Sequence, residues 1–287
     1  MSMTDVAVAA NTLCFVKAET TVGTLVKPTA TDAVFILGDV SLPWEREILD
    51  DEQHRNSPSR TTLLAGRYNP ASYSIETYIK PSGTAGTPPE VKTLLTSALG
   101  SYLNTPATSD AFSLATALPS FSLYVKNDHT MFAISGATVN ELRAIVNGTQ
   151  FGRLRFSGQG IRKYWAGTAK IVTATSGQKS IVVESGGAKR YTVGMYINVG
   201  ADTNTGAGYL IDSVTPGTDT LTVTTNLASG AANTEYVTPW APTPTEVGAP
   251  VFGKLGMATK GGTNLPILSA EVRSEERRVG KECTIQC

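Results

Sequence analysis

Residues 121–137, FSLYVKNDHTMFAISGA, contain two short runs in which apolar and polar side chains alternate. Alternation with a period of two is typical of a strand that buries one face. The runs, Phe121–Lys126 and Thr130–Ala137, are separated by KNDHT, in which Asn127 and Asp128 tolerate the positive φ that a tight hairpin turn requires. The stretch therefore predicts an antiparallel β-hairpin and a mainly-β fold.

Similar alternating runs lie on both sides of this hairpin, and each is bounded by turn residues. They are Ala33–Leu42, Ser72–Lys80 and Gly152–Gly160. The segment NELRAIV is compatible with a short helical turn or with a strand, because β-branched residues occur in it and just before it. We therefore expect a β-rich body in residues 1–165.

One helix is predicted, in TPPEVKTLLTSALG. Thr87 is suited to cap it, Pro88 to the first helical position and Glu90 to the capping-box position. Apolar residues then recur on one helical face, at Val91, Leu94, Leu95, Ala98 and Leu99. Because Gly100 is placed to end the helix, we expect Glu90–Leu99 to pack its apolar stripe on a β-sheet.

The composition changes after IRKYWAG, and residues 166–240 are rich in Thr, Val and Gly. Five short strand patterns, AKIVTAT, KSIVVES, YTVGMYINVG, GYLIDSVT and TLTVTT, are separated by turn signals such as SGQK and TPGTD. We expect a small all-β module inserted at residues 166–242. The Pro-spaced segment TPWAPTPTEVGAP leads out of it, and short strands of the body resume in residues 243–272.

The last fifteen residues, RSEERRVGKECTIQC (273–287), differ in style from the rest, since seven are charged and two are cysteines. The string closely resembles a translated adapter-like tail that recurs at the broken ends of genes in assembled metagenomic sequence. We expect it to be foreign, with the genuine C-terminal part of the body missing. A natural charged tail is the alternative.

The 287-residue chain carries 24 basic and 24 acidic side chains, so its formal net charge is zero. Proteins that bind phosphates through many contacts need unpaired Lys and Arg gathered on one face, and this balance disfavours that class. Neither a signal peptide nor a membrane helix is expected, because no long apolar run is present. Cys14, Cys283 and Cys287 form no disulfide framework and fit synthesis in a reducing cytoplasm.

The stretch WEREILDDEQHRNSPSR, residues 44–60, gathers five acids, three arginines and one of the two histidines. Adjacent acids on an extended segment point to opposite faces, and neither a calcium-loop nor a His-x-x-x-His pattern is present, so we expect no metal or acid–base site. Interleaved charges of both signs suit a contact repeated between identical subunits. The residues expected at this interface are Glu45, Arg46, Glu47, Asp50, Asp51, Glu52, Arg55 and Arg60.

The other candidates for chemistry are weaker. Cys14 lies in an apolar segment without a nearby histidine, and no Gly-x-Ser-x-Gly elbow is present. The glycines of GADTNTGAG lack the Lys-Ser/Thr of a phosphate loop and predict a β-turn. Arg153 and Arg155 share a strand face, with Arg162 and Lys163 beyond, and interleaved aromatics hint at nucleic acid. Zero net charge favours ion pairs with acidic partners instead. Because none of these patterns forms a catalytic or ligand set, we expect a non-enzymatic protein without cofactor or metal.

Several long stretches resemble the major tail tube proteins of long-tailed, siphovirus-like bacteriophages. They are ETTVGTLVKPTATDAVFILGDVSLPWEREILDDEQHRNSPSR, GRYNPASYSIETYIKPSGTAGTPPEVKTLLTSALG, GQGIRKYWAG, VGMYINVGADTNTGAGYLIDSV and EVGAPVFGKLGMATKGGTNLPILSAEV. The resemblance covers about residues 10 to 272 and concerns an order of segments rather than a catalytic motif.

The resemblance implies a β-sandwich or barrel with one flanking helix and a long loop that reaches a neighbouring subunit or ring. Six copies would close a ring, and stacked rings would form the tail tube. The implied partners are the chain itself, the tape-measure protein and the tail terminator, with DNA crossing the lumen without specific binding and no membrane contact. The implied location is the virion tail, assembled in the bacterial host cytoplasm, with the inserted module projecting outward for host contact or decoration.

Three other functions remain open from the sequence. The chain could be another virion β-protein, such as a tail terminator or decoration protein. It could be a carbohydrate-binding or adhesin module, for which Tyr191, Tyr196 and Tyr209 form a weak set of aromatic candidates. An enzyme is the least favoured, because no catalytic constellation is present.

Overall fold

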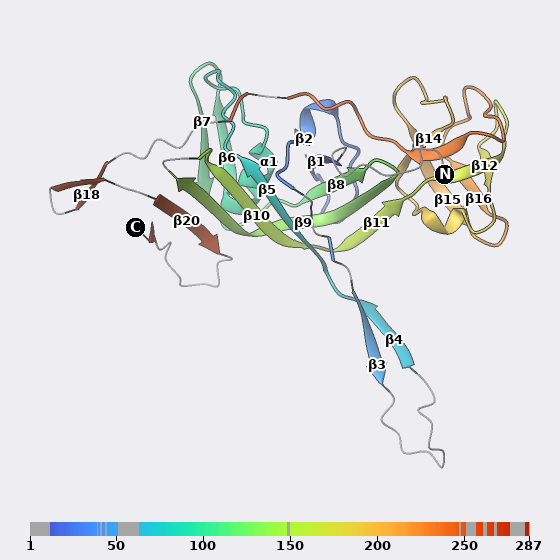
Figure 1. The fold of residues 1–287 in the computed structure, drawn as a ribbon, viewed down its shortest axis with the longest axis horizontal. Helices are drawn as coiled ribbons and strands as arrows, with labels where there is room; N and C mark the ends of the chain where they lie inside the picture. Colours follow the sequence, from blue (N-terminus) through green and yellow to red (C-terminus); the bar gives the residue numbers. More distant parts are fainter. Residues whose placement is uncertain are drawn as a thin grey trace, which may run out of the picture.

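The computed structural model describes residues 12–38, 40, 42–43, 45–50, 63–147, 150–246 and 248–250, and the strands 257–260, 263–266, 269–275 and 285–286. Antiparallel strands dominate this part of the chain, and it contains one α-helix (Figure 1). The predicted mainly-β fold class is confirmed.

Two sheets of the body share one long strand, β9 (Thr130–Asn147). The first sheet contains, in spatial order, β2 (Ala33–Val34), β1 (Thr12–Ala18), β8 (Phe121–Asn127), the first half of β9 and β11 (Arg162–Ala166). The second contains β5 (Ala71–Tyr78), β10 (Arg153–Gly160), the second half of β9, β20 (Ser269–Glu275) and β21 (Ile285–Gln286). The predicted strands at Ser72–Lys80 and Gly152–Gly160 thus form neighbours in one sheet.

The β8–β9 connection confirms the hairpin predicted from KNDHT. Asn127 pairs with Thr130, and Asp128 between them has φ 42°. NELRAIV is strand, not helix, because it continues β9 between two partner strands. The predicted strand Ala33–Leu42 is mostly wrong: regular pairing ends at Val34, and Gly38 turns the chain at φ 72°.

Helix α1 (Lys92–Leu99) packs on the body core through buried Leu94, with Val91 buried just before it. Its end is as predicted, since Gly100 adopts φ 100° and its N–H donates to the carbonyl of Thr96. The predicted start at Glu90 with Thr87 as cap is wrong. Val91 is the N-cap and makes no side-chain cap bond, while Glu90 is buried beside Lys80 instead.

Six strands form a closed barrel within the range expected for the inserted module. In spatial order they are β12 (Ala169–Ala174), β13 (Ser180–Val183), β16 (Thr220–Val223), β15 (Tyr209–Thr215), β14 (Tyr196–Val199) and β17 (Tyr236–Pro239). All five predicted strand patterns are present, and β17 was not predicted. Inward-facing apolar residues alternate along these strands and fill the interior.

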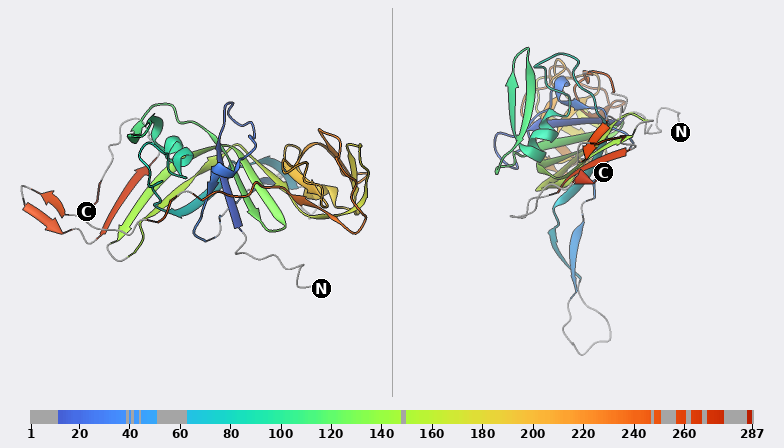
Figure 2. Two further views of the ribbon diagram at one scale, coloured as in Figure 1. Left: turned by 90° about the horizontal axis from the view of Figure 1, so that it is seen from above. Right: turned by 90° about the vertical axis from the view of Figure 1, so that its left-hand side faces the viewer.

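Three two-stranded ribbons complete the described strands: β3 (Arg46–Asp50) with β4 (Leu63–Tyr68), β6 (Gly100–Thr105) with β7 (Ser109–Leu114), and β18 (Met257–Lys260) with β19 (Thr263–Pro266). Two short 3₁₀ turns also occur, η3 (Ala30–Asp32) and η4 (Ala188–Arg190). Figures 1 and 2 show the β3–β4 ribbon pointing away from the body, separate from both sheets.

Candidate assembly surfaces

Part of the charged stretch at residues 44–60 forms β3, the first strand of the β3–β4 ribbon. Glu45 precedes β3 and accepts a backbone hydrogen bond from Asn69 N–H at 3.0 Å, which closes the base of the ribbon. Arg46, Glu47 and Asp50 lie within β3. Of the other predicted interface residues, Asp51, Glu52, Arg55 and Arg60 lie outside the described residues, as does His54.

In the pairing of the ribbon, charged residues of β3 flank two apolar positions. Arg46 is opposite Tyr68, and Asp50 is opposite Leu63. Between them, the apolar residues Ile48 and Leu49 are opposite Ala65 and Leu64. Glu45 and Glu47 are exposed, and neither forms an ion pair with another described residue. The ribbon therefore offers the carboxylates of Glu45 and Glu47, which have no ion-pair partner among the described residues.

The outward face of β5 and β10 is polar, and it contains an ion pair between Arg153 and Glu76. Burial alternates along both strands, so Arg153 and Arg155 share this face, as predicted. The Arg153 guanidinium lies 3.1 Å from the Glu76 carboxylate, and Arg155 Nε donates to Ser74 Oγ at 3.3 Å. Exposed pairs of this kind contribute about 0–1 kcal/mol to stability. The ion pair neutralises the charge of Arg153, whereas the hydrogen bond from Arg155 goes to a neutral hydroxyl.

The barrel is docked on the body through an apolar core that both parts share. Phe15, Tyr124 and Tyr164 of the body belong to the same buried cluster as the barrel interior. Figure 1 shows the barrel at one end of the body, beyond β11. Backbone bonds continue across the junction, with Thr192 N–H donating to the Trp165 carbonyl at 2.9 Å.

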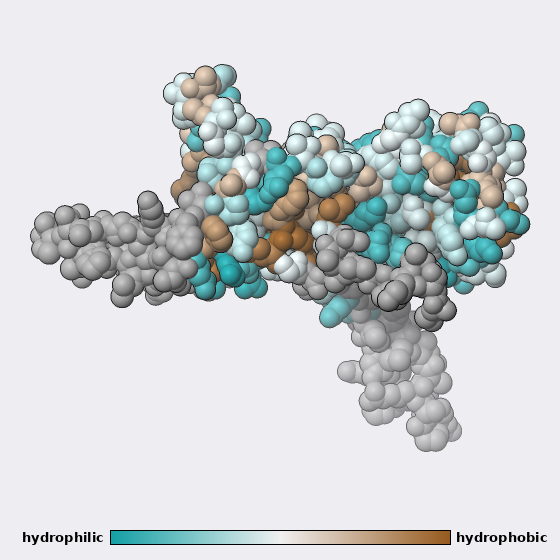
Figure 3. All heavy atoms as spheres, turned by 45° about the horizontal axis from the view of Figure 1, so that its top comes forward, coloured by the Kyte–Doolittle hydropathy of each residue, from teal (hydrophilic) through white to brown (hydrophobic). Residues whose placement is uncertain are grey.

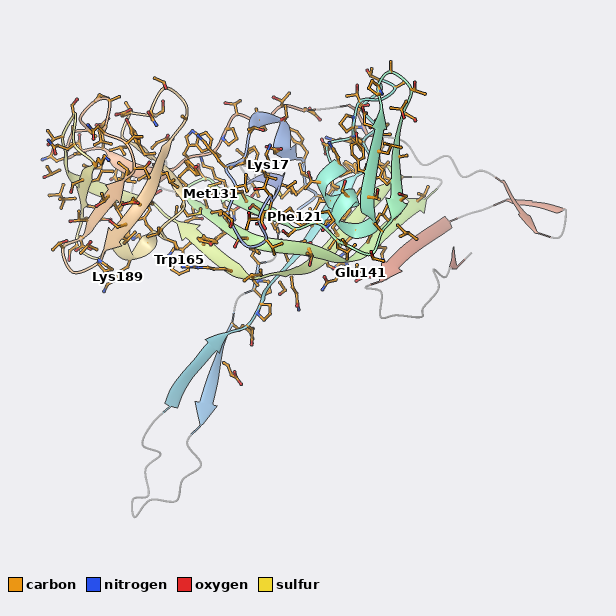
Figure 4. The ribbon with its side chains drawn as sticks, turned by 180° about the vertical axis from the view of Figure 1, so that it is seen from behind. Lys17, Phe121, Met131, Glu141, Trp165 and Lys189 are labelled. Atoms are coloured by element: carbon orange, nitrogen blue, oxygen red, sulfur yellow. The ribbon has the colours of Figure 1, made fainter. Side chains whose placement is uncertain are left out.

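Lys27 adds a polar anchor between the two parts. Its ammonium lies 4.4 Å from the Trp240 ring centroid and 4.8 Å from that of Tyr196, and it donates to the Ala207 carbonyl. Burial lowers the pKa of Lys27 below its ordinary value. Trp165 also lies at the junction (Figure 4), where its indole N–H donates to the Lys189 carbonyl at 3.4 Å.

The tyrosines that a glycan-binding module would need to expose are structural. Tyr191 is 4% exposed and donates to the Val237 carbonyl, while Tyr209 is fully buried and donates to Asp202 Oδ2 at 2.8 Å. Tyr196 packs against Trp240 with ring centroids 5.7 Å apart. Burial raises the pKa of all three phenols. They form no exposed aromatic row, so this candidate set is wrong.

A buried charge cluster was missed by the sequence reading. Lys80 Nζ lies 2.9 Å from Glu246 Oε1 and 3.9 Å from Glu90 Oε2, and 4.6 Å from the Phe35 ring centroid. The Glu90 side chain is 1% exposed, and burial raises its pKa, an effect that nearby Lys80 opposes. The cluster ties the segment that leaves the barrel to β5 and the start of α1.

The described residues also place the remaining candidates for chemistry. They contain no group of three or more His, Cys, Asp or Glu side chains placed to hold a metal ion. Cys14 is buried, as predicted, and burial is the main cause that raises the pKa of its thiol to about 12. GADTNTGAG forms tight turns, also as predicted, with Gly206 N–H donating to the Thr203 carbonyl. No helix in the described ranges is long and apolar enough to cross a membrane.

Comparison with known proteins gives a partial structural likeness. No family model matches the chain, and no curated protein matches it. Among solved structures, it is similar to a chain from the cryo-EM structure of an extracellular contractile injection system, the PVC sheath–tube complex in the extended state. The match has 9% sequence identity and a TM-score of 0.36, and covers 57% of this chain and 94% of the other.

Proposed function

We propose that this protein is a structural subunit of a phage tail tube, in which copies of the chain associate into stacked rings, six to a ring. The observation that carries the proposal is the β3–β4 ribbon. It pairs only with itself among the described strands and projects from the body. An isolated two-stranded ribbon is marginally stable in water, and its open edges invite pairing with another chain.

A neighbouring copy is the simplest partner for the ribbon. Its β3 strand brings carboxylates and an arginine together with aliphatic residues, which suits both polar and apolar contacts. When one surface of a protomer binds a different surface of the next, the contact closes into a ring or continues as a filament. Both outcomes are needed in a tube, within a ring and between rings.

The outward face of β5, β10 and the second half of β9 suits the wall of a DNA channel. It carries Ser72, Ser74 and Ser157, together with the ion pair between Arg153 and Glu76. DNA binds tightly to surfaces that release many counterions from its phosphates. The pairing of Arg153 with Glu76 reduces the number of counterions that this face can release, so DNA would pass along it without being held.

The remaining parts of the proposal follow from this role. The chain acts without catalysis or cofactor, and its partners are other copies, the tape-measure protein and the tail terminator, in a virion tail assembled in the host cytoplasm. The barrel is placed on the outside of the tube as decoration or for host contact. Figure 3 supports an outer position, because the strongest apolar colour on the face shown lies over the body rather than over the barrel.

Sedimentation velocity over a wide range of concentration tests the proposal. The native chain should form large species, and the substitution Ile48→Lys in the ribbon should leave a folded monomer, because it places a charge opposite Ala65. Val172→Lys, at an exposed position of β12, is the matched control and should assemble normally. A single ring size that never stacks would instead indicate a tail terminator, and a native chain that stays monomeric would exclude both.

A further inference from the structure

An exposed ridge lies at the corner where the two sheets of the body diverge. Val22 is 68% exposed and Ile161 is 62% exposed, and Arg162 beside it is also exposed. The Ile161 side chain lies over Gly23 and Gly136: a Cβ built at these positions would be 3.3 Å and 2.5 Å from its Cδ1. The ridge is therefore one contiguous and fixed feature rather than separate surface residues.

A groove of about 510 Å³ adjoins this ridge. Ile161 and Gln159 form part of one wall, and Asn69 and Pro70, at the base of the β3–β4 ribbon, form another. Arg162 stacks on the Tyr164 ring at 5.0 Å and forms no ion pair with any described residue. The corner thus combines aliphatic surface, a groove and an unpaired positive charge.

The β3–β4 ribbon has the complementary chemistry. Its register brings Leu49 opposite Leu64 and Ile48 opposite Ala65, and Glu47 is an exposed carboxylate with no ion-pair partner in the described chain. Figures 1 and 2 show that the ribbon runs away from its own body. A ribbon that projects in this way can reach a second molecule.

We propose that the Val22–Ile161–Arg162 ridge is the socket for the β3–β4 ribbon of a second copy of this chain. In the contact, the ribbon covers Val22 and Ile161, and the Glu47 carboxylate of one copy pairs with the Arg162 guanidinium of the next. The inference rests on the proposed function and adds the surface that receives the ribbon. After one contact has formed, one copy still has a free ridge and the other still has a free ribbon, so the contact propagates.

A charge exchange tests the pairing. Arg162→Glu and Glu47→Arg each replace attraction by repulsion, so each variant alone should need a roughly tenfold higher concentration to assemble. The double variant Arg162→Glu/Glu47→Arg restores opposite charges across every contact and should assemble like the native chain. An equimolar mixture of the two single variants should also co-assemble. Lys179→Glu, an exposed cation on the barrel, is the matched control and should have no effect.

The outcomes separate this inference from the proposed function. Circular dichroism and thermal melting would confirm that each variant is folded. If native polymers form and the single variants assemble equally well, the socket is wrong while the tube remains. If the single variants fail and the double variant fails too, the pairing of these two residues is also wrong. If the native chain never assembles, both proposals fall.

Discussion

Replacing Lys27 by methionine tests how firmly the barrel is held on the body. The native ammonium makes two cation–π contacts, at 4.4 Å and 4.8 Å, and one hydrogen bond to the Ala207 carbonyl. Such contacts contribute about 0.5–1 kcal/mol for each ring and about 1.5–3 kcal/mol for a charged hydrogen bond. Methionine keeps the apolar stem against Trp240 and removes the desolvation cost of the ammonium, which offsets part of the loss.

The expected net destabilisation by Lys27→Met is therefore about 1–2 kcal/mol. For a chain of this size, that lowers the midpoint of thermal unfolding by about 2–8 °C. Differential scanning calorimetry provides the measurement, and Lys179→Met at an exposed site on the barrel provides the control. An unchanged midpoint for Lys27→Met would show that Lys27 does not anchor the barrel and that the shared apolar core is sufficient.

Three further predictions concern the body and the ribbon. The folded pKa of Glu90 is raised, so between pH 4.5 and that folded pKa the native state binds more protons than the unfolded state. The free energy of unfolding therefore falls as pH rises through this window. Glu90→Gln should flatten this dependence in thermal melts across pH 4–8. Gly158→Ala should prevent folding, since its Cβ would lie 1.9 Å from the Thr138 carbonyl oxygen. Gly177 has open space around it and φ 77°, so Gly177→Ala should lower the free energy of unfolding by only about 1–2 kcal/mol. Chemical denaturation measures both. Reversing the charges of Arg46, Arg55 and Arg60 to Glu should leave a folded monomer that forms no tubes in negative-stain images; normal tubes from that variant would argue against the ribbon as the contact.

The sequence predicted those parts of the fold that local periodicity controls. The β8–β9 hairpin was found because its alternation and its turn residues agree, and β5 and β10 for the same reason. The barrel strands were recognised because turn signals separate them. The predicted strand ended at Ala137, before NELRAIV, whereas β9 continues to Asn147. Only the partners β10 and β20 show that the strand continues.

The failures come from contacts between residues far apart in the chain. TPPE has the residues of a capping box, but the Glu90 carboxylate lies 3.9 Å from Lys80 Nζ, and the helix starts later. Residues Ile36 and Leu37 were expected in a continuous strand, yet they bond to the edge of β5 after the regular pairing of β2 has ended. Local chemistry gives no sign of either contact.

The candidate assembly surfaces were predicted only in part. The unusual charge content of residues 44–60 predicted a long loop at an interface, because charge density is visible in the sequence. The strands β3 and β4 of the ribbon were not predicted, and the interface role stays a prediction. The ridge was not predicted, since it depends on the packing of Ile161 over Gly23, the neighbour of Val22, and over Gly136 of β9, which are distant in sequence. The Lys80–Glu90–Glu246 cluster likewise joins three distant segments.

The central claim is that this chain functions by binding copies of itself. Electron microscopy of the purified full-length protein at high concentration tests that claim most directly. The account predicts rings and stacked rings around an open channel, with a ribbon from each copy reaching the next. Particles that stay single at every concentration, with their ribbons free, would contradict it.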